Sequence, residues 1–193
     1  MAAFSFIKIE YTTTMKVIVG LGNPGKEYDG TRHNVGREFA AVIAKKYRFE
    51  QFVESTKYAG LVAKGEIEGE KTLIVLPNTF MNKSGKALAD AGVKLKDLIV
   101  IHDDTDILLG SVKASFGKRS AGHRGVDSVM RAVKSRDFWR IRIGVQKKKR
   151  VDAMQLVLKK WTPAEKLVLK KVEKRIMELI AADLQITTFS VLI

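Results

Sequence analysis

The stretch Val17–Gly25, which reads VIVGLGNPG, sets the fold class of this 193-residue chain. Its first three residues are apolar and β-branched, and they predict a short buried strand. The glycines that follow end the strand and open a polar loop, which runs from Gly22 to His33. Asn34 can then cap a helix that we expect to run to about Tyr47. A buried strand, a loop and a helix in this order are typical of an α/β protein.

Apolar runs and turn residues alternate along the rest of the chain. Further strands are predicted at 98–101, 112–116 and 139–145, and residues 58–76 predict two strands joined by a turn at Glu68-Gly69. Helices are predicted from about 85 to 91 and over 126–133, 152–159 and 163–184, with Pro163 at a favoured first helical position. Segments 103–106, 117–125 and 147–150 are predicted loops. The pattern predicts a single-domain α/β fold over residues 15–193, a mixed sheet flanked by helices, preceded by an N-terminal extension over residues 1–14.

The charge of the chain favours a polyanionic partner. Lys and Arg together number 35 and Asp and Glu 21, which gives a net charge of +14. Such an excess suits nucleic acid, since each neutralised phosphate releases condensed counterions. The chain has no cysteine, which excludes disulfides and thiolate zinc sites. No apolar run approaches the ~20 residues that span a bilayer, and no secretory signal is evident, so we expect a cytoplasmic protein with no membrane partner.

The glycines of the first loop also match a dinucleotide-binding pattern. Gly20, Gly22 and Gly25 have the spacing GxGxxG. In a true fingerprint the helix starts at the glycines, so that its first amides face the pyrophosphate. Here Pro24 and the polar residues 26–32 intervene, which disfavours nucleotide binding.

Three histidines are better candidates for chemistry. His33, His102 and His123 all follow predicted strands, and ligands collect at the carboxyl ends of strands in α/β sheets. Asp103, with two more aspartates at 104 and 106, adjoins His102. A carboxylate beside an imidazole can fix its tautomer and stabilise its cation, as in acyl-transfer enzymes. The same cluster could bind a divalent metal, or form only a solvated turn.

Five segments, in this order, resemble the motifs of bacterial-type peptidyl-tRNA hydrolases. They are VGLGNPG at 19–25 with Tyr28 and TRHNVG at 31–36, PNTFMNKSG at 77–85, HDDTD at 102–106, GHRG at 122–125 and WRIRIGV at 139–145. Several spaced motifs together are far more specific than any one of them. The resemblance covers about residues 15 to 180.

The resemblance implies a monomeric enzyme that needs no metal or other cofactor. It would cut the ester bond between a peptide and the 3′-terminal ribose of tRNA. His33 corresponds to the family's general base and Asp103 to the aspartate that orients it. Asn23 corresponds to the residue that helps to distinguish a blocked peptidyl end from a free amine.

The resemblance also implies a set of substrate contacts. Asn82 would hold the substrate near the ester, and Tyr28 and Phe80 would line the site for the tRNA end, with Met81 packed beside them. His123 and Arg124 lie in the fourth motif and are expected to contact substrate. Phosphates of the acceptor stem and CCA end would be bound by basic side chains: Lys113 and Arg142, with Lys118, Arg119, Arg140 and the run 147–150 nearby.

One departure and two alternatives bear on this interpretation. The fourth motif of the family usually reads GHNG, whereas this chain has Arg124 in place of the asparagine. One alternative function is a non-catalytic RNA-binding relative of the same fold, because fold does not determine function. The other is a metal-dependent hydrolase whose ligands are His33, His102, Asp103 and His123.

Overall fold

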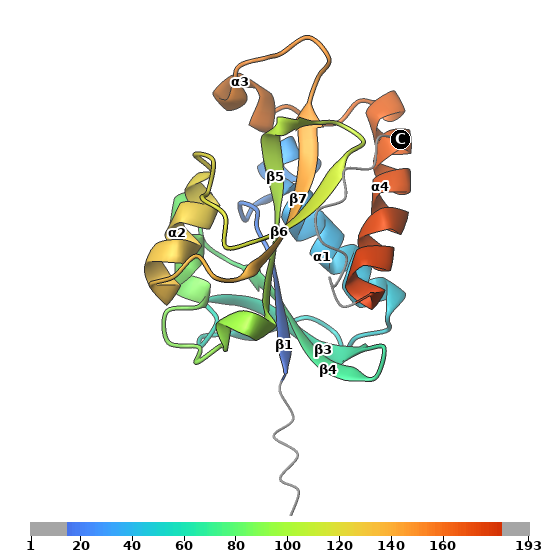
Figure 1. Ribbon diagram of the computed structural model, residues 1–193. Coiled ribbons are helices and arrows are strands. Elements are labelled where there is room, and N and C mark those ends of the chain that lie inside the picture. The colour runs from blue at the N-terminus through green and yellow to red at the C-terminus, as the bar shows by residue number, and fades with distance from the viewer. Residues whose placement is uncertain (1–14, 183–193) are drawn as a thin grey trace, which may run out of the picture.

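The predicted first strand is β1, Lys16–Gly20, and it lies in the middle of a seven-stranded sheet (Figure 1). The computed structural model describes residues 15–182. The N-terminal extension expected over 1–14 and the expected end of the last helix therefore lie outside the described residues.

The other elements are, in chain order, α1 (Val35–Lys46), β2 (Val53–Ser55), β3 (Gly60–Ile67), β4 (Glu70–Pro77), β5 (Leu98–Leu108), β6 (Val112–Phe116), α2 (Arg124–Val133), β7 (Trp139–Gln146), α3 (Ala153–Val157) and α4 (Pro163–Ala181). Short 3-10 turns cover Lys26–Tyr28, Arg32–Asn34, Met81–Ala87 and Leu95–Asp97. Within residues 15–182 no helix is both long enough and apolar enough to cross a membrane.

The sheet is mixed, as predicted, in the strand order β2-β3-β4-β1-β5-β7-β6. β1 is parallel to β4 and β5, and β5 is parallel to β7. β2 and β3 add antiparallel strands on one side and β6 on the other. Because the carboxyl ends of β1, β4, β5 and β7 meet at one edge, the segments that follow these strands are brought together there.

Helices cover both faces of the sheet, with α1 and α4 on one face and α2 on the other (Figure 1). Ile18 packs into the core under α1 and α4, whereas its neighbours Val17 and Val19 pack into the core under α2. The β-branched run is thus buried on both faces, which explains why it has no polar residues.

The acidic segment 103–106 is not the loop that we predicted. β5 continues through it to Leu108, because Asp103 and Asp104 pair with Ile143 and Gly144 of β7. His102 therefore lies inside a strand and not beyond its end. The polar sequence of this segment predicted a loop, although Asp103 and Asp104 lie in a buried part of β5, where other side chains donate hydrogen bonds to them.

Three smaller differences concern local structure. Strand β2 was not predicted, because its short, exposed sequence has no apolar alternation. The segment Met81–Ala87 is a 3-10 helix that begins earlier than the helix expected from about residue 85. Helix α2 begins at Arg124 and not at 126, so that His123 takes the N-cap position.

Candidate active site at the carboxyl ends of the parallel strands

A cavity of about 690 Å³ lies at the edge where the parallel strands end. One part of its wall carries the side chains of Asn23, His33, Asp103 and His123. Apolar residues of α3 and the position after it, among them Met154 and Leu158, line another part. The cavity therefore combines a few converging polar groups with an apolar surface, as ligand sites commonly do.

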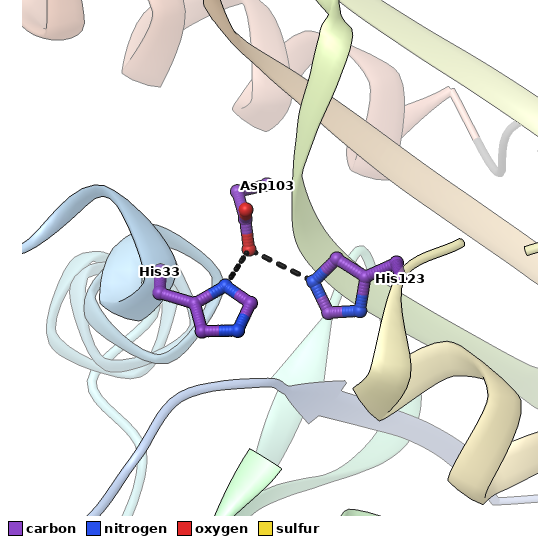
Figure 2. A group of neighbouring side chains, drawn as sticks. All are labelled: His33, Asp103 and His123. Atoms are coloured by element: carbon purple, nitrogen blue, oxygen red, sulfur yellow. Dashed lines mark hydrogen bonds and ion pairs between the residues drawn. The ribbon is translucent and has the colours of Figure 1, made fainter. Parts of the chain in front are cut away.

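His33 enters this cavity from the turn before α1. Gly36, in the first turn of that helix, lies so close to β5 that a Cβ atom would collide with the carbonyl group of Ile101. The missing side chain lets the start of α1 lie against the strand that carries Asp103. As a result, His33 Nδ1 lies 2.9 Å from Asp103 Oδ1 (Figure 2).

The contact with a carboxylate assigns the proton on the His33 ring. Ionised Asp103 can only accept hydrogen bonds, so the neutral imidazole donates from Nδ1. Its Nε2 atom then carries a lone pair. A histidine with this tautomer can act as a general base through Nε2.

His123 donates to the same oxygen from the other side. Its Nε2 atom lies 2.9 Å from Asp103 Oδ1, and its Nδ1 atom accepts from the backbone N–H groups of Gly125 and Val126, each at 3.2 Å. Figure 2 shows the two imidazoles converging on one carboxylate oxygen. Burial alone would raise the pKa of Asp103, but His123 and His33 outweigh it and hold this pKa well below its ordinary value. Asp103 is therefore a carboxylate at neutral pH.

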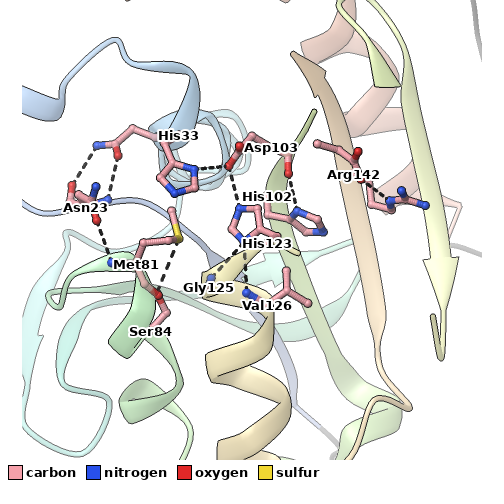
Figure 3. A network of polar contacts seen from close by, with 12 residues as sticks. Asn23, His33, Met81, Ser84, His102, Asp103, His123, Gly125, Val126 and Arg142 are labelled. Atoms are coloured by element: carbon pink, nitrogen blue, oxygen red, sulfur yellow. Dashed lines mark hydrogen bonds and ion pairs between the residues drawn. The ribbon is translucent and has the colours of Figure 1, made fainter. Parts of the chain in front are cut away.

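His102 belongs to a second layer behind this group. It is buried, its Nδ1 atom donates to the backbone carbonyl of Asp103 at 2.6 Å, and its ring lies edge-on to His123 with centroids 4.7 Å apart (Figure 3). Burial, helped by His123 and Arg140, lowers the pKa of His102 well below its ordinary value. A neutral His102 is thus a packing partner of the site and does not line the cavity.

Asn23 is held in place by Asn34, which acts differently from our prediction. The side chain of Asn34 makes no cap for α1. It accepts from the backbone N–H of Asn23 at 2.8 Å and donates to the carbonyl of Asn23 at 2.9 Å. The Oδ1 atom of Asn23 in turn accepts from the N–H of Met81 at 2.8 Å (Figure 3). Since the oxygen is engaged, Asn23 has its amide N–H groups left to offer to the cavity.

The group could in principle hold a metal, because one ligand atom from each of His33, Asp103 and His123 lies within 4.8 Å of the others. The hydrogen bonds argue against that use. Nδ1 of His123 accepts from two helix amides, so its neutral ring carries a proton on Nε2, the atom that faces the group. A metal there would have to displace that proton and also the proton on Nδ1 of His33. The arrangement fits hydrogen bonding better than metal ligation.

Comparison with known proteins shows the family of the chain. A family model described as peptidyl-tRNA hydrolase matches residues 17–189 of the chain. The chain belongs to the peptidyl-tRNA hydrolase family. The peptidyl-tRNA hydrolase of Caldanaerobacter subterraneus subsp. tengcongensis is 40% identical over 168 residues, which cover 85% of this chain and 90% of the relative. The enzyme of that name from Thermoanaerobacter sp. is 43% identical over 156 residues, which cover 79% of this chain and 83% of the relative. A crystal structure of peptidyl-tRNA hydrolase from Acinetobacter baumannii has a TM-score of 0.78 at 28% identity, and covers 89% of this chain and 90% of its own.

The residues expected from the sequence to contact substrate fall into two groups. Phe80, Met81, Asn82 and Arg124 line the cavity with His123. Tyr28 does not line it but lies edge-on to the exposed ring of Phe80, with centroids 6.3 Å apart. The structure thus gathers these residues at one edge of the sheet.

The basic residues expected to bind the phosphates, other than Arg124, lie outside the cavity. Lys113 and Arg142 are paired across β6 and β7, and Arg142 Nε donates to Asp104 Oδ2 at 2.6 Å. Arg140, which we expected near the phosphates, is fully buried, and its guanidinium donates to the carbonyl of Arg119. Arg140 is therefore not available to a phosphate at the surface.

Proposed function

We propose that this member of the peptidyl-tRNA hydrolase family hydrolyses the ester bond between a peptide and the 3′-terminal ribose of tRNA. The products are the free peptide and free tRNA. The single observation that carries the proposal is the pair of His33 Nδ1 and Asp103 Oδ1, 2.9 Å apart in the wall of the cavity. This pair leaves a basic nitrogen, Nε2, for a water molecule.

The chemistry follows from the protonation states of the pair. Nε2 of His33 removes a proton from water as the water oxygen attacks the ester carbonyl, and Asp103 stabilises the resulting imidazolium through Nδ1–H. When the tetrahedral intermediate collapses, the bond to the ribose oxygen breaks and the same Nε2–H returns a proton to that oxygen. Water is thereby divided between the carboxyl group of the peptide and the hydroxyl group of the ribose.

Asn23 supports the distinction between a blocked peptidyl end and a free amine. Its oxygen already accepts from Met81, so its amide presents donors to the cavity. Donors can bind a carbonyl oxygen of a peptide or of an N-blocked group. A free α-ammonium group also carries only donors, and it would face Asn23 without a hydrogen bond.

Basic residues support a tRNA partner, bound through its acceptor stem and CCA end. The chain has a net charge of +14, and Lys113 lies beside Arg142 on the strand pair next to the site. Phosphate contacts position a nucleic acid without reading its sequence, which suits an enzyme that accepts many tRNAs. We extend the proposal to a monomer acting in the cytoplasm, with residues 15–193 as one domain and 1–14 as an extension.

A non-catalytic RNA-binding relative is the alternative. Such a protein would need the fold and the basic surface but not a paired base. Here Asp103 is buried and ionised, with two histidines on one oxygen. Burial of an ionised carboxylate has a desolvation cost, and RNA binding does not require such a group. The arrangement therefore favours catalysis.

The test is the release of free tRNA from an N-acetyl-aminoacyl-tRNA. We expect turnover by the wild-type protein, before and after treatment with a chelator. His33→Ala should lower kcat by about 10²–10⁴-fold, the usual share of general base catalysis. A folded His33→Ala protein with near-normal turnover would remove His33 from its role, and loss of wild-type activity on chelation, restored by zinc, would favour the metal-dependent alternative.

A further inference from the structure

We infer that His123 is a positioning residue, which holds the Asp103 carboxylate for His33 and has no ring nitrogen free for substrate. The inference rests on the proposed function of His33 as general base. It differs from our sequence-based expectation, in which His123 belonged to the substrate contacts.

Both nitrogens of the His123 ring are engaged within the protein. Nδ1 accepts from the N–H groups of Gly125 and Val126, and Nε2 lies 2.9 Å from Asp103 Oδ1. The ring itself is packed between His102 and His33, with centroid distances of 4.7 and 5.1 Å. With both nitrogens engaged, the ring has no strong hydrogen bond left to offer to the cavity.

Helix α2 decides which nitrogen carries the proton. His123 is the N-cap of this helix, and the backbone groups that meet Nδ1 are N–H donors. A proton on Nδ1 would face two donors and leave both of these amides without an acceptor. The neutral ring must therefore carry its proton on Nε2, where it is donated to Asp103. In this way the start of a helix sets the hydrogen bonding of a carboxylate on strand β5.

The shared oxygen makes the two histidines interdependent. Among residues 15–182, the side chains that donate to the Asp103 carboxylate are those of His33 and His123, and both donate to Oδ1. Two donors on one oxygen fix the direction of the carboxylate. The hydrogen bond from His123 also draws negative charge from Oδ1, so that Asp103 holds the proton on a protonated His33 less strongly.

Two substitutions separate the two ring nitrogens. In His123→Asn the side-chain oxygen occupies the place of Nδ1 and is a favoured N-cap, but the side chain is too short to reach Asp103. In His123→Gln the amide nitrogen occupies the place of Nε2 and can donate to Asp103, but the cap is lost. Each variant keeps one function of the ring and removes the other.

The two variants should therefore lose different properties: His123→Asn should lose turnover, and His123→Gln should lose thermal stability. For His123→Asn, kcat should fall by roughly 10- to 100-fold, the cost of one hydrogen bond to a charged group. The acidic limb of the pH profile of kcat/KM should move to higher pH by roughly half a unit to one unit, with KM little changed. For His123→Gln, the acidic limb should stay near that of the wild type, whereas the Tm should fall by about 2–4 °C because the cap of α2 is lost.

Nitrogen-15 NMR of histidine-labelled wild-type protein tests the inference without any assay of turnover. At pH 8 the His123 ring should show a protonated Nε2 and an unprotonated Nδ1. A proton on Nδ1, or a His123→Asn protein with raised KM and an unmoved acidic limb, would overturn the inference. A wild-type protein that does not release tRNA would overturn the proposed function instead, and the NMR result would still decide the state of His123.

Discussion

Arg32 and Glu165, 133 residues apart in the chain, form a partly buried ion pair in which Arg32 Nη2 donates to Glu165 Oε1 at 2.6 Å. The Nη1 atom of Arg32 donates to the carbonyl groups of Lys159 and Lys160, and the guanidinium lies 4.7 Å from the centre of the Trp161 ring. Arg32 immediately precedes His33. These contacts therefore hold the segment between α3 and α4 against the turn that carries the proposed base. They also help to position α3, which adds the apolar wall of the cavity.

Removal of this arginine should be costly. Arg32→Ala should lower the free energy of unfolding by about 3 kcal/mol, because it removes the hydrogen bonds of the guanidinium to Glu165 and to the carbonyl groups of Lys159 and Lys160. Arg150→Ala is the matched control, since its ion pair with Asp106 is exposed on both sides. That control should change stability by less than about 0.5 kcal/mol in the same urea titration. Equal, small losses in the two variants would show that the Arg32 pair does not fasten the fold.

The buried His102 should make the protein sensitive to mild acid. Because its pKa in the folded state lies well below the ordinary value, the unfolded chain takes up a proton that the folded chain does not. Stability should therefore fall as the pH drops below ~6.5, by up to about 1.4 kcal/mol per pH unit from this group. His102→Asn keeps a donor in the place of Nδ1 but cannot titrate. Its unfolding free energy, measured between pH 7 and 5, should have a shallower slope; parallel slopes would mean that folded His102 is charged.

The elements of the sheet were largely predictable, because apolar runs such as residues 17–19 and 98–101 are buried by the fold in which they occur. The carboxyl-terminal part of β5 could not be predicted as a strand. Its buried carboxylates are stabilised by His33 and Arg142, and only the tertiary structure brings these residues close to them. The resemblance of the motifs pointed to His33 and Asp103, but no spacing in the sequence could show that His123 donates to the same oxygen. Arg32 was overlooked for a similar reason. A lone arginine in a loop gives no sign that it is buried against partners more than a hundred residues away.

Binding of tRNA should depend strongly on salt. If Lys113 and Arg142 each neutralise one phosphate, changing both to Gln should flatten the log–log slope of affinity against salt by about 1.4 to 1.8, from roughly 0.7 to 0.9 for each contact. Lys45 and Lys46, exposed at the far end of α1, provide a control pair with the same loss of charge. Changing both of these to Gln should leave the slope nearly as in the wild type. Equal slopes in the two double variants would contradict a phosphate grip at Lys113 and Arg142.

The last prediction concerns Arg124, where the family usually has asparagine. Arg124 is exposed, lines the cavity, and makes no ion pair with any residue of the range 15–182. Both nearby carboxylates are engaged, since Asp103 accepts from two histidines and Asp104 from Arg142. Arg124 therefore does not compete with His33 for Asp103, and its guanidinium is available to an external anion. A phosphate at the CCA end suits its planar set of donors.

The test is Arg124→Asn, compared on an N-acetyl-aminoacyl-tRNA and on a short N-acetyl-aminoacyl ester without phosphates. If Arg124 binds phosphate, KM for the tRNA substrate should rise roughly tenfold, the value of one charged hydrogen bond, while kcat/KM for the short ester stays unchanged. Arg131→Asn removes a charge from an exposed position on the same helix, away from the cavity, and should affect neither substrate. Equal losses of Arg124→Asn on both substrates would contradict the phosphate role, because a group that acts on an ester without phosphates must act at the catalytic centre itself.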